Sequence, residues 1–235
     1  MTAAEIVEQI EPLGLASYRK VLFNHGVREP VLGVKIEELK KYQRAIKKDY
    51  RLALDLFDTG IYDAQYLAGL VADESRMTAD DFRHWVDAST CGAISTTAVA
   101  WVAAESPHGR QLALEWIESA DERTAETGWA TLGSWVSVTD DARLDLAELR
   151  RLLDRVERTI HQEPNRVRCT MNLFVIALGS YVRELAEEAL QAGERIGPVS
   201  VDTGPNACRT PFAPDSIRKV QQRGTVGKKR KSAKC

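Results

Sequence analysis

The feature that most constrains the fold of this chain is the spacing of its apolar residues, which recur every three or four positions along most of the sequence. This is the spacing of one face of an α-helix, and it fills segments of about 10 to 18 residues separated by short turns. Ile36–Lys48 is a clear example. The alternation that marks a half-buried strand is almost absent, and only Val199–Val201 fits a short extended piece. The sequence therefore predicts an all-α protein.

Capping and breaking residues divide this pattern into helices. Thr78 and Asp81 have the spacing of a capping box, and Ser106 before Pro107 is expected to begin another helix. The remaining helices are expected over Thr2–Ile10, Leu15–His25, Ile36–Lys48, Asp49–Phe57, Asp63–Ala72, Arg123–Val138, Leu146–His161, Pro164–Ser180 and Tyr181–Arg195. Two such helices with their turns occupy about 35 to 45 residues, the period of HEAT-like units, which stack into a curved α-α superhelix. A compact, non-repetitive bundle is the alternative, because no clean sequence repeat is visible.

The chain of 235 residues fits one domain or a short repeat array. Gly197-Pro198 ends the helical pattern, so we expect a HEAT-like helical-repeat domain over residues 1–197 and an irregular C-terminal segment over 198–235. A short helix is expected from Asp215 to Gln222, and roughly the last dozen residues are expected to be flexible.

No apolar run approaches the roughly 18 residues needed to span a bilayer, and the acidic N-terminus is not a secretory signal, so we expect a cytoplasmic protein that does not enter membranes. Neither the scattered cysteines nor the histidines have the spacing of a metal site. Reduced thiols and no metal site are therefore expected. The protein is also expected to be a monomer. The cysteines are Cys91, Cys169, Cys208 and Cys235.

The positive charge of the chain is concentrated at its C-terminus. Residues 216–235 hold eight basic residues and no acid, which leaves 24 of the 32 basic residues against all 34 acidic ones in residues 1–215. A basic tail on an acidic body is typical of proteins that contact polyanions. Its densest run is Lys228-Lys229-Arg230-Lys231, which we predict to contact DNA phosphates. A disordered end that only increases solubility is the alternative.

Two further cations stand where the helix after Pro164 begins. Arg166 and Arg168 would converge there with unpaired backbone N–H groups, an arrangement that suits a phosphate. The alternative is that these arginines pair with acids such as Glu163.

Most tryptophans on amphipathic helices are core residues, but aromatic side chains also stack on bases. Trp129 is the preferred candidate for such a role, because the small residues around it favour a cleft. A pocket lined by Trp101, Trp129, Asn172 and Ser95 is expected on this basis and on the resemblance below. No carboxylate pair has catalytic spacing, so the catalytic residues stay unknown.

Several short motifs, taken in their order along the chain, resemble one known family. They are Tyr18-Arg19-Lys20, Leu32-Gly33-Val34, Asp63-Ala64-Gln65-Tyr66-Leu67-Ala68, Trp101-Val102-Ala103-Ala104-Glu105-Ser106, Asn165-Arg166-Val167-Arg168 and Gly227-Lys228-Lys229-Arg230-Lys231. Together they are similar to the AlkD-type DNA alkylation repair proteins over most of residues 14–235. The resemblance implies stacked HEAT-like helix pairs, a concave cationic face that grips DNA, and a glycosylase that removes N3- and N7-alkylated purines without a cofactor.

The sequence departs from that family where the lesion cleft holds an Asp, an Arg and two Trp residues. By the resemblance, Cys91 stands for the first Trp and Ser95 for the Asp, the Arg position falls near Gly128, beside Trp129, and the second Trp position falls near Leu173. There is no Asp or Glu from Ser89 to Ala104, so a small shift of the alignment does not restore the carboxylate. A hydroxyl cannot replace that charge beside a developing cation.

These observations predict a DNA-binding relative of the alkylation repair glycosylases that contacts damaged or branched duplex DNA and has weak or lost base-excision activity. Two alternatives stay open. One is an active glycosylase for N3- and N7-alkylated purines with a rearranged pocket, and the other is a helical scaffold that holds a protein partner.

Overall fold

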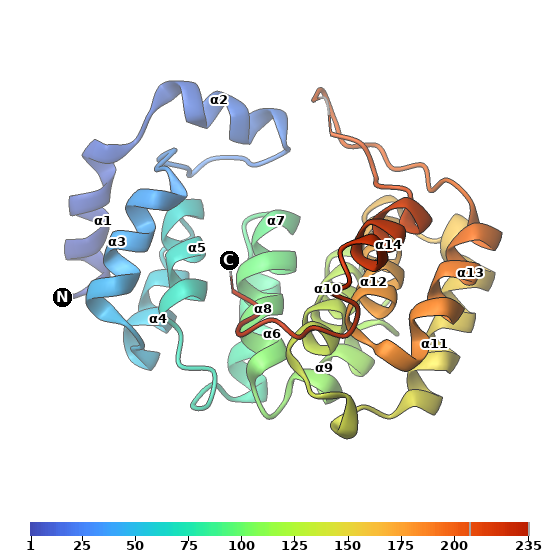
Figure 1. Cartoon of the computed structure of the whole chain (residues 1–235). Coiled ribbons are helices and arrows are strands. Elements are labelled where there is room, and N and C mark those ends of the chain that lie inside the picture. The colour runs from blue at the N-terminus through green and yellow to red at the C-terminus, as the bar shows by residue number, and fades with distance from the viewer. Residues whose placement is uncertain (207, 235) are drawn as a thin grey trace. The chain divides into compact units, whose positions relative to one another are not determined.

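The computed structural model describes residues 1–206 and 208–234, and these residues form helices joined by turns, with no strand (Figure 1). The predicted all-α class is confirmed. The chain divides into two compact units, described separately below. Unit 1 contains residues 1–108 with 203–206 and 234, and unit 2 contains residues 109–202 with 208–233. Cys91, Cys169 and Cys208 form no disulfide, and Cys235 lies outside the described residues.

Unit 1 begins with α1, whose start is fixed by a capping box between Thr2 and Glu5. The predicted capping box of Thr78 and Asp81 is present at the start of α6. The elements of unit 1 are α1 (Ala3–Ile10), η1 (Glu11–Leu13), α2 (Ala16–Asn24), α3 (Ile36–Ile46), α4 (Tyr50–Phe57), α5 (Tyr62–Val71), α6 (Ala79–Ala88), α7 (Gly92–Ile94), η2 (Ser95–Val99) and α8 (Ala100–Glu105).

Two differences from the expected helices lie at the end of unit 1. The sequence did not predict the helical run from α7 to α8, which contains a π-helical turn at η2. The hydroxyls of Thr96 and Thr97 donate to carbonyls four residues earlier. This contact bends helices, and the residues that make it have low helix propensity, so the sequence pattern does not predict a helix here. Ser106 does not begin a helix directly, because its hydroxyl accepts from His108 N–H in a turn and α9 starts at Gly109.

Unit 2 consists of three helix pairs, α9 with α10, α11 with α12, and α13 with α14, whose apolar faces share one core. Trp129 on α10 packs against Phe174 on α12 at the centre of that core. The elements are α9 (Gly109–Trp116), α10 (Glu122–Val138), η3 (Asp141–Arg143), α11 (Leu146–Thr159), η4 (Ile160–Gln162), α12 (Asn165–Tyr181), η5 (Arg183–Leu185), α13 (Ala186–Ile196) and α14 (Ala213–Gln222). Helix α14 corresponds to the short helix expected from Asp215 to Gln222.

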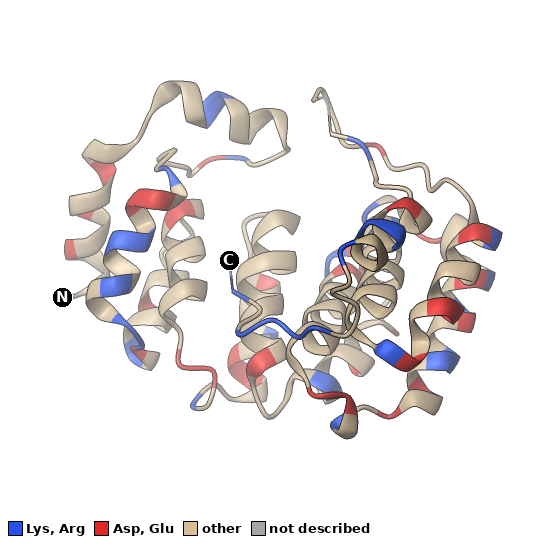
Figure 2. Cartoon of the chain, in the orientation of Figure 1, with Lys and Arg blue, Asp and Glu red and all other residues tan. Residues whose placement is uncertain are grey.

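Four ion pairs of unit 2 join residues that are 37 or 38 positions apart. Arg110 on α9 pairs with Glu148 on α11 (2.6 Å), and Arg150 on α11 pairs with Glu188 on α13 (2.9 Å). Two more ion pairs accompany these, one between Glu118 and Arg155 and one between Glu157 and Arg195. Figure 2 shows basic and acidic positions interleaved on α11 and α13. We call these four pairs the ion-pair ladder. It reveals a repeat of helix pairs with a HEAT-like period that the sequence pattern did not show.

Candidate nucleic-acid interface

The start of α12 holds the two predicted arginines, but its first N–H groups are partly occupied. The backbone N–H of Arg166 donates to Glu122 Oε1 at 2.7 Å, so the expected cluster of unpaired N–H groups is reduced by an acid from α10. The Arg166 side chain is exposed and makes no ion pair within 4 Å in the described part of the chain. Arg166 is therefore available to an external anion.

Arg168 is half-buried and is held in place by a local contact. Its Nη2 donates to Asn165 Oδ1 at 3.3 Å, while its buried Nε has no hydrogen-bond partner among the described residues. Neither Arg166 nor Arg168 pairs with Glu163 there, in contrast to the alternative weighed from the sequence.

A buried carboxylate that the sequence did not single out lies near Arg166. Glu126 on α10 is 5% exposed. Burial raises the pKa of Glu126 to about 7, and the charge of Arg166 opposes the rise. Cys169 on α12 lies in the same electrostatic neighbourhood, and burial raises the pKa of its thiol. No local signal in the sequence distinguishes Glu126, because its burial depends on helices far away along the chain.

The basic tail follows a defined path across the C-terminal ends of two helices. Gly227 N–H donates to the carbonyl of Ser180 on α12 (2.9 Å), and Arg230 N–H donates to the carbonyl of Ser137 on α10 (2.8 Å). The Nζ of Lys229 donates to the carbonyl of Val136 (2.9 Å). The last carbonyls of a helix lack partners within it and carry the negative end of its dipole, which explains why a basic segment is ordered here rather than flexible.

The four basic residues of the tail do not have equal roles. Lys229 also pairs with Asp141 at 2.7 Å and is mostly buried, which corrects its expected role as a DNA contact, since its charge is already neutralised. Lys228 and Lys231 are exposed and make no ion pair in the described residues. Arg230 also exposes its side chain.

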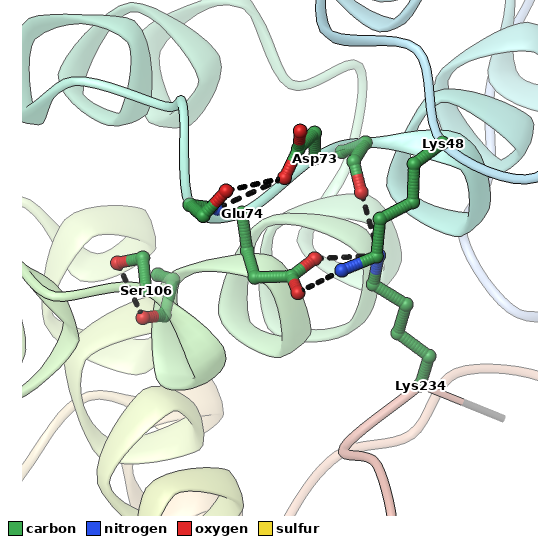
Figure 3. Close-up of polar contacts among 8 residues, drawn as sticks. Lys48, Asp73, Glu74, Ser106 and Lys234 are labelled. Atoms are coloured by element: carbon green, nitrogen blue, oxygen red, sulfur yellow. Dashed lines mark hydrogen bonds and ion pairs between the residues drawn. The ribbon is translucent and has the colours of Figure 1, made fainter.

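Lys234 is also held in place, by contacts with residues of unit 1. Its Nζ donates to the carbonyl of Ala72 (2.9 Å) and lies 3.4 Å from Glu74. Lys48 pairs with the same carboxylate, so both lysines point toward Glu74 (Figure 3). Burial lowers the pKa of Lys234, and the charge of Glu74 opposes that change.

The predicted pocket residues of unit 1 are buried. Trp101 on α8 is 8% exposed and packs edge-on against Tyr66 with ring centroids 5.8 Å apart. Ser95 has no exposed surface, and its hydroxyl donates to the carbonyl of Gly92 at 3.1 Å.

The predicted pocket residues of unit 2 are buried as well. Asn172 on α12 donates to the carbonyl of Pro211 at 2.9 Å. Trp129 is 1% exposed, and the guanidinium of Arg155 lies 5.7 Å from its ring. The expected cleft beside Trp129 is corrected, because the small residues near it allow α9 to approach closely instead of leaving a space.

Gly128 shows this close approach directly. A Cβ atom at Gly128 would lie 2.8 Å from the backbone nitrogen of Ile117 and 3.0 Å from the carbonyl oxygen of Ala113. Gly128, near which the family's Arg is expected, therefore has no room for a side chain. Leu173, at the second Trp position, is 46% exposed.

The described residues contain no cluster of three or more His, Cys, Asp or Glu side chains suited to a metal ion. Among them there is also no helix with the length and apolar character required to cross a membrane.

Comparisons with known proteins agree with this picture. A family model described as DNA alkylation repair enzyme matches residues 11–206. Uncharacterised proteins of Listeria innocua and Listeria monocytogenes are each 28% identical over 228 residues, which cover 95% of this chain and 99% of each relative. A solved structure, described as a new family of proteins related to the HEAT-like repeat DNA glycosylases with affinity for branched DNA structures, matches all of both chains with a TM-score of 0.91 and 31% identity. The predicted HEAT-like repeat fold is thus confirmed, and the chain belongs to the DNA alkylation repair enzyme family.

Proposed function

We propose that this protein binds branched duplex DNA through the phosphate backbone and that its base-excision activity is weak or lost. The relative matched over its whole length is described as having affinity for branched DNA structures, and this similarity carries the proposal. The exposed guanidinium of Arg166, with Arg168 beside it and Lys228, Arg230 and Lys231 on the tail, supplies the cations that phosphates require.

The loss of excision follows from the residues at the positions that resemble the family's lesion cleft. A carboxylate beside a developing cation contributes strongly to catalysis, and the buried hydroxyl of Ser95, already engaged with Gly92, cannot supply that charge. Gly128 adds a second obstacle, because the close approach of α9 excludes an arginine there.

The proposal includes a cytoplasmic monomer in which residues 1–197 form the helical-repeat domain and residues 198–235 carry the tail. Light scattering of the purified protein tests the monomeric state.

The decisive experiment combines two assays on one preparation. Affinity for a four-way junction and for a linear duplex is measured across a salt series, and release of 7-methylguanine and 3-methyladenine is measured from alkylated DNA. We expect tighter binding to the junction and little or no base release. Equal affinities for junction and duplex would refute branched-DNA recognition, and rapid base release would refute the loss of excision.

Arg166→Ala tests the contact itself. It should lower the slope of log affinity against log salt by about one, as expected for the loss of one phosphate contact. Arg151→Ala is the matched control, since Arg151 is an exposed cation on α11 without an assigned DNA contact, and it should leave the slope unchanged.

A further inference from the structure

We propose that α2 recognises unpaired bases at the branch point of DNA, with Phe23 stacking on a base and Lys20 facing a neighbouring phosphate. This inference rests on the proposed function, and it names the element that distinguishes branched from linear DNA.

The first observation is the exposure of apolar side chains on α2. Five large apolar side chains are exposed in the described residues, and three belong to α2 or to the residue before it. Val21 is 46% exposed, Phe23 41% and Leu15 42%. Most large apolar residues of this chain are buried, so a local concentration of exposed ones indicates a binding surface.

The second observation is that Leu22 is the one buried residue among Ala16–Asn24, the residues of α2. Leu22 is buried and packs with Val27 and Val31, while Tyr18, one turn earlier, contacts the same small cluster. The carbonyl of Asn24 accepts a hydrogen bond from Asn206 Nδ2 at 3.0 Å. Tyr18 and Leu22 are one helical turn apart and face inward, so Lys20 lies on the opposite side of α2, with Val21 and Phe23 exposed at its two edges.

The third observation is the charge of this helix. Residues 16–24 contain Arg19 and Lys20 and no acid, and α2 carries a blue segment without a red one in Figure 2. Arg19 pairs with Glu29 and lies 5.8 Å from the ring of Phe23. Lys20 is exposed and makes no ion pair within the described residues. A cation next to an exposed aromatic ring suits a polyanion that also offers flat apolar surfaces, which is the combination found in nucleic acid with unpaired bases.

Linear duplex DNA does not offer these surfaces, because its bases are paired and stacked. A branch or fork exposes base faces, and a protein aromatic ring can stack on any of them regardless of sequence. Phe23 is therefore expected to contribute to branched-DNA affinity and not to duplex affinity.

The test compares a forked DNA with a linear duplex that has the same number of phosphates. Affinities of both are measured by fluorescence anisotropy for the full chain and for Phe23→Ser, Phe23→Leu and Phe23→Trp. Phe23→Ser and Phe23→Leu should weaken fork binding about tenfold, near the lower end of the contribution of one stacked base, and should leave duplex binding unchanged. Phe23→Trp should retain fork binding, and the fluorescence of 2-aminopurine placed at the fork should fall with the original protein and with Phe23→Trp but not with Phe23→Ser.

The outcomes separate this inference from the proposed function. If the unmodified protein does not prefer the fork, the proposed function itself fails. If it prefers the fork and Phe23→Ser retains that preference, Phe23 does not read the branch point and the inference is overturned. If Phe23→Leu binds the fork as well as the unmodified protein does, apolar contact without stacking explains the surface and the inference is overturned. Far-UV circular dichroism of each variant checks that the fold is intact.

Discussion

The carboxylate of Asp63 accepts the backbone N–H of Val34 at 2.7 Å, across 29 positions of the chain. The same carboxylate accepts the N–H groups of Leu32 (2.6 Å) and Gly33 (3.3 Å), and its side chain is completely buried. Two of the short motifs that resemble the DNA alkylation repair family, one around Gly33 and one beginning at Asp63, are thus parts of a single structural device. Asp63 holds the loop before α3 against the start of α5.

Asp63→Ala should lower the free energy of unfolding by roughly 3 kcal/mol, because it leaves several buried N–H groups without acceptors. Urea denaturation measures the change. Asp87→Ala is the control, since Asp87 is exposed on α6, and it should change stability by less than about 0.5 kcal/mol. A loss for Asp63→Ala as small as that of the control would show that water replaces the carboxylate.

The raised pKa of Glu126 predicts that the stability of the protein depends on pH. Its pKa in the folded chain is about 7, against a usual value of 4.5, so the folded state keeps the proton that the unfolded state releases. The protein should therefore lose stability as the pH rises from about 4.5 to about 7, by about 3 kcal/mol in total. Glu126→Gln should remove this loss, raising the melting temperature at pH 8 and changing it little at pH 4.5. Glu8→Gln, at an exposed position on α1, should show no such difference between the two pH values.

Two lysines of the basic tail should differ in what they contribute: Lys229 to the stability of the fold and Lys231 to DNA binding. Lys229→Met removes the ion pair with Asp141 and the donor to Val136 at the end of α10, so it should cost about 1 to 2 kcal/mol of stability. Lys231→Met should leave the melting temperature unchanged and reduce the salt dependence of DNA binding by about one contact. Thermal melts and salt titrations on both variants distinguish the two roles, and equal behaviour of the two variants would contradict the assignment of Lys229 as an anchor.

Two glycines of α10 should respond in opposite directions to the same substitution. Gly128→Ala places a Cβ 2.8 Å from the backbone of Ile117 and should destabilise the protein by about 1 to 3 kcal/mol. Gly133→Ala has only ordinary contacts, the nearest at 3.7 Å, and should stabilise α10 by up to about 1 kcal/mol. Denaturation curves of the two variants measure the difference, and a stabilising Gly128→Ala would mean that α9 moves away at little cost.

Features encoded by neighbouring residues were predicted well from the sequence. The all-helical class, the capping box of Thr78 and the helix near Asp215 depend on spacing and caps within a few positions. Features that depend on distant partners were not predicted. The burial of Glu126 and the engagement of Lys229 require segments far along the chain, and the absence of space at Gly128 requires the close packing of α9 on α10, which no local pattern reveals.

The ion-pair ladder limits which insertions and deletions of residues unit 2 can accept without losing its ion pairs. Each ion pair of the ladder joins α9, or the turn just after it, to α11, or joins α11 to α13, and equivalent charges recur at almost constant spacing. Arg110 and Arg150 are 40 positions apart, as are Glu148 and Glu188, so loss or duplication of one whole helix pair would keep complementary charges opposite each other, whereas a change of another length would shift them out of register. The electrostatics of unit 2 therefore favour growth and shortening by complete pairs of helices.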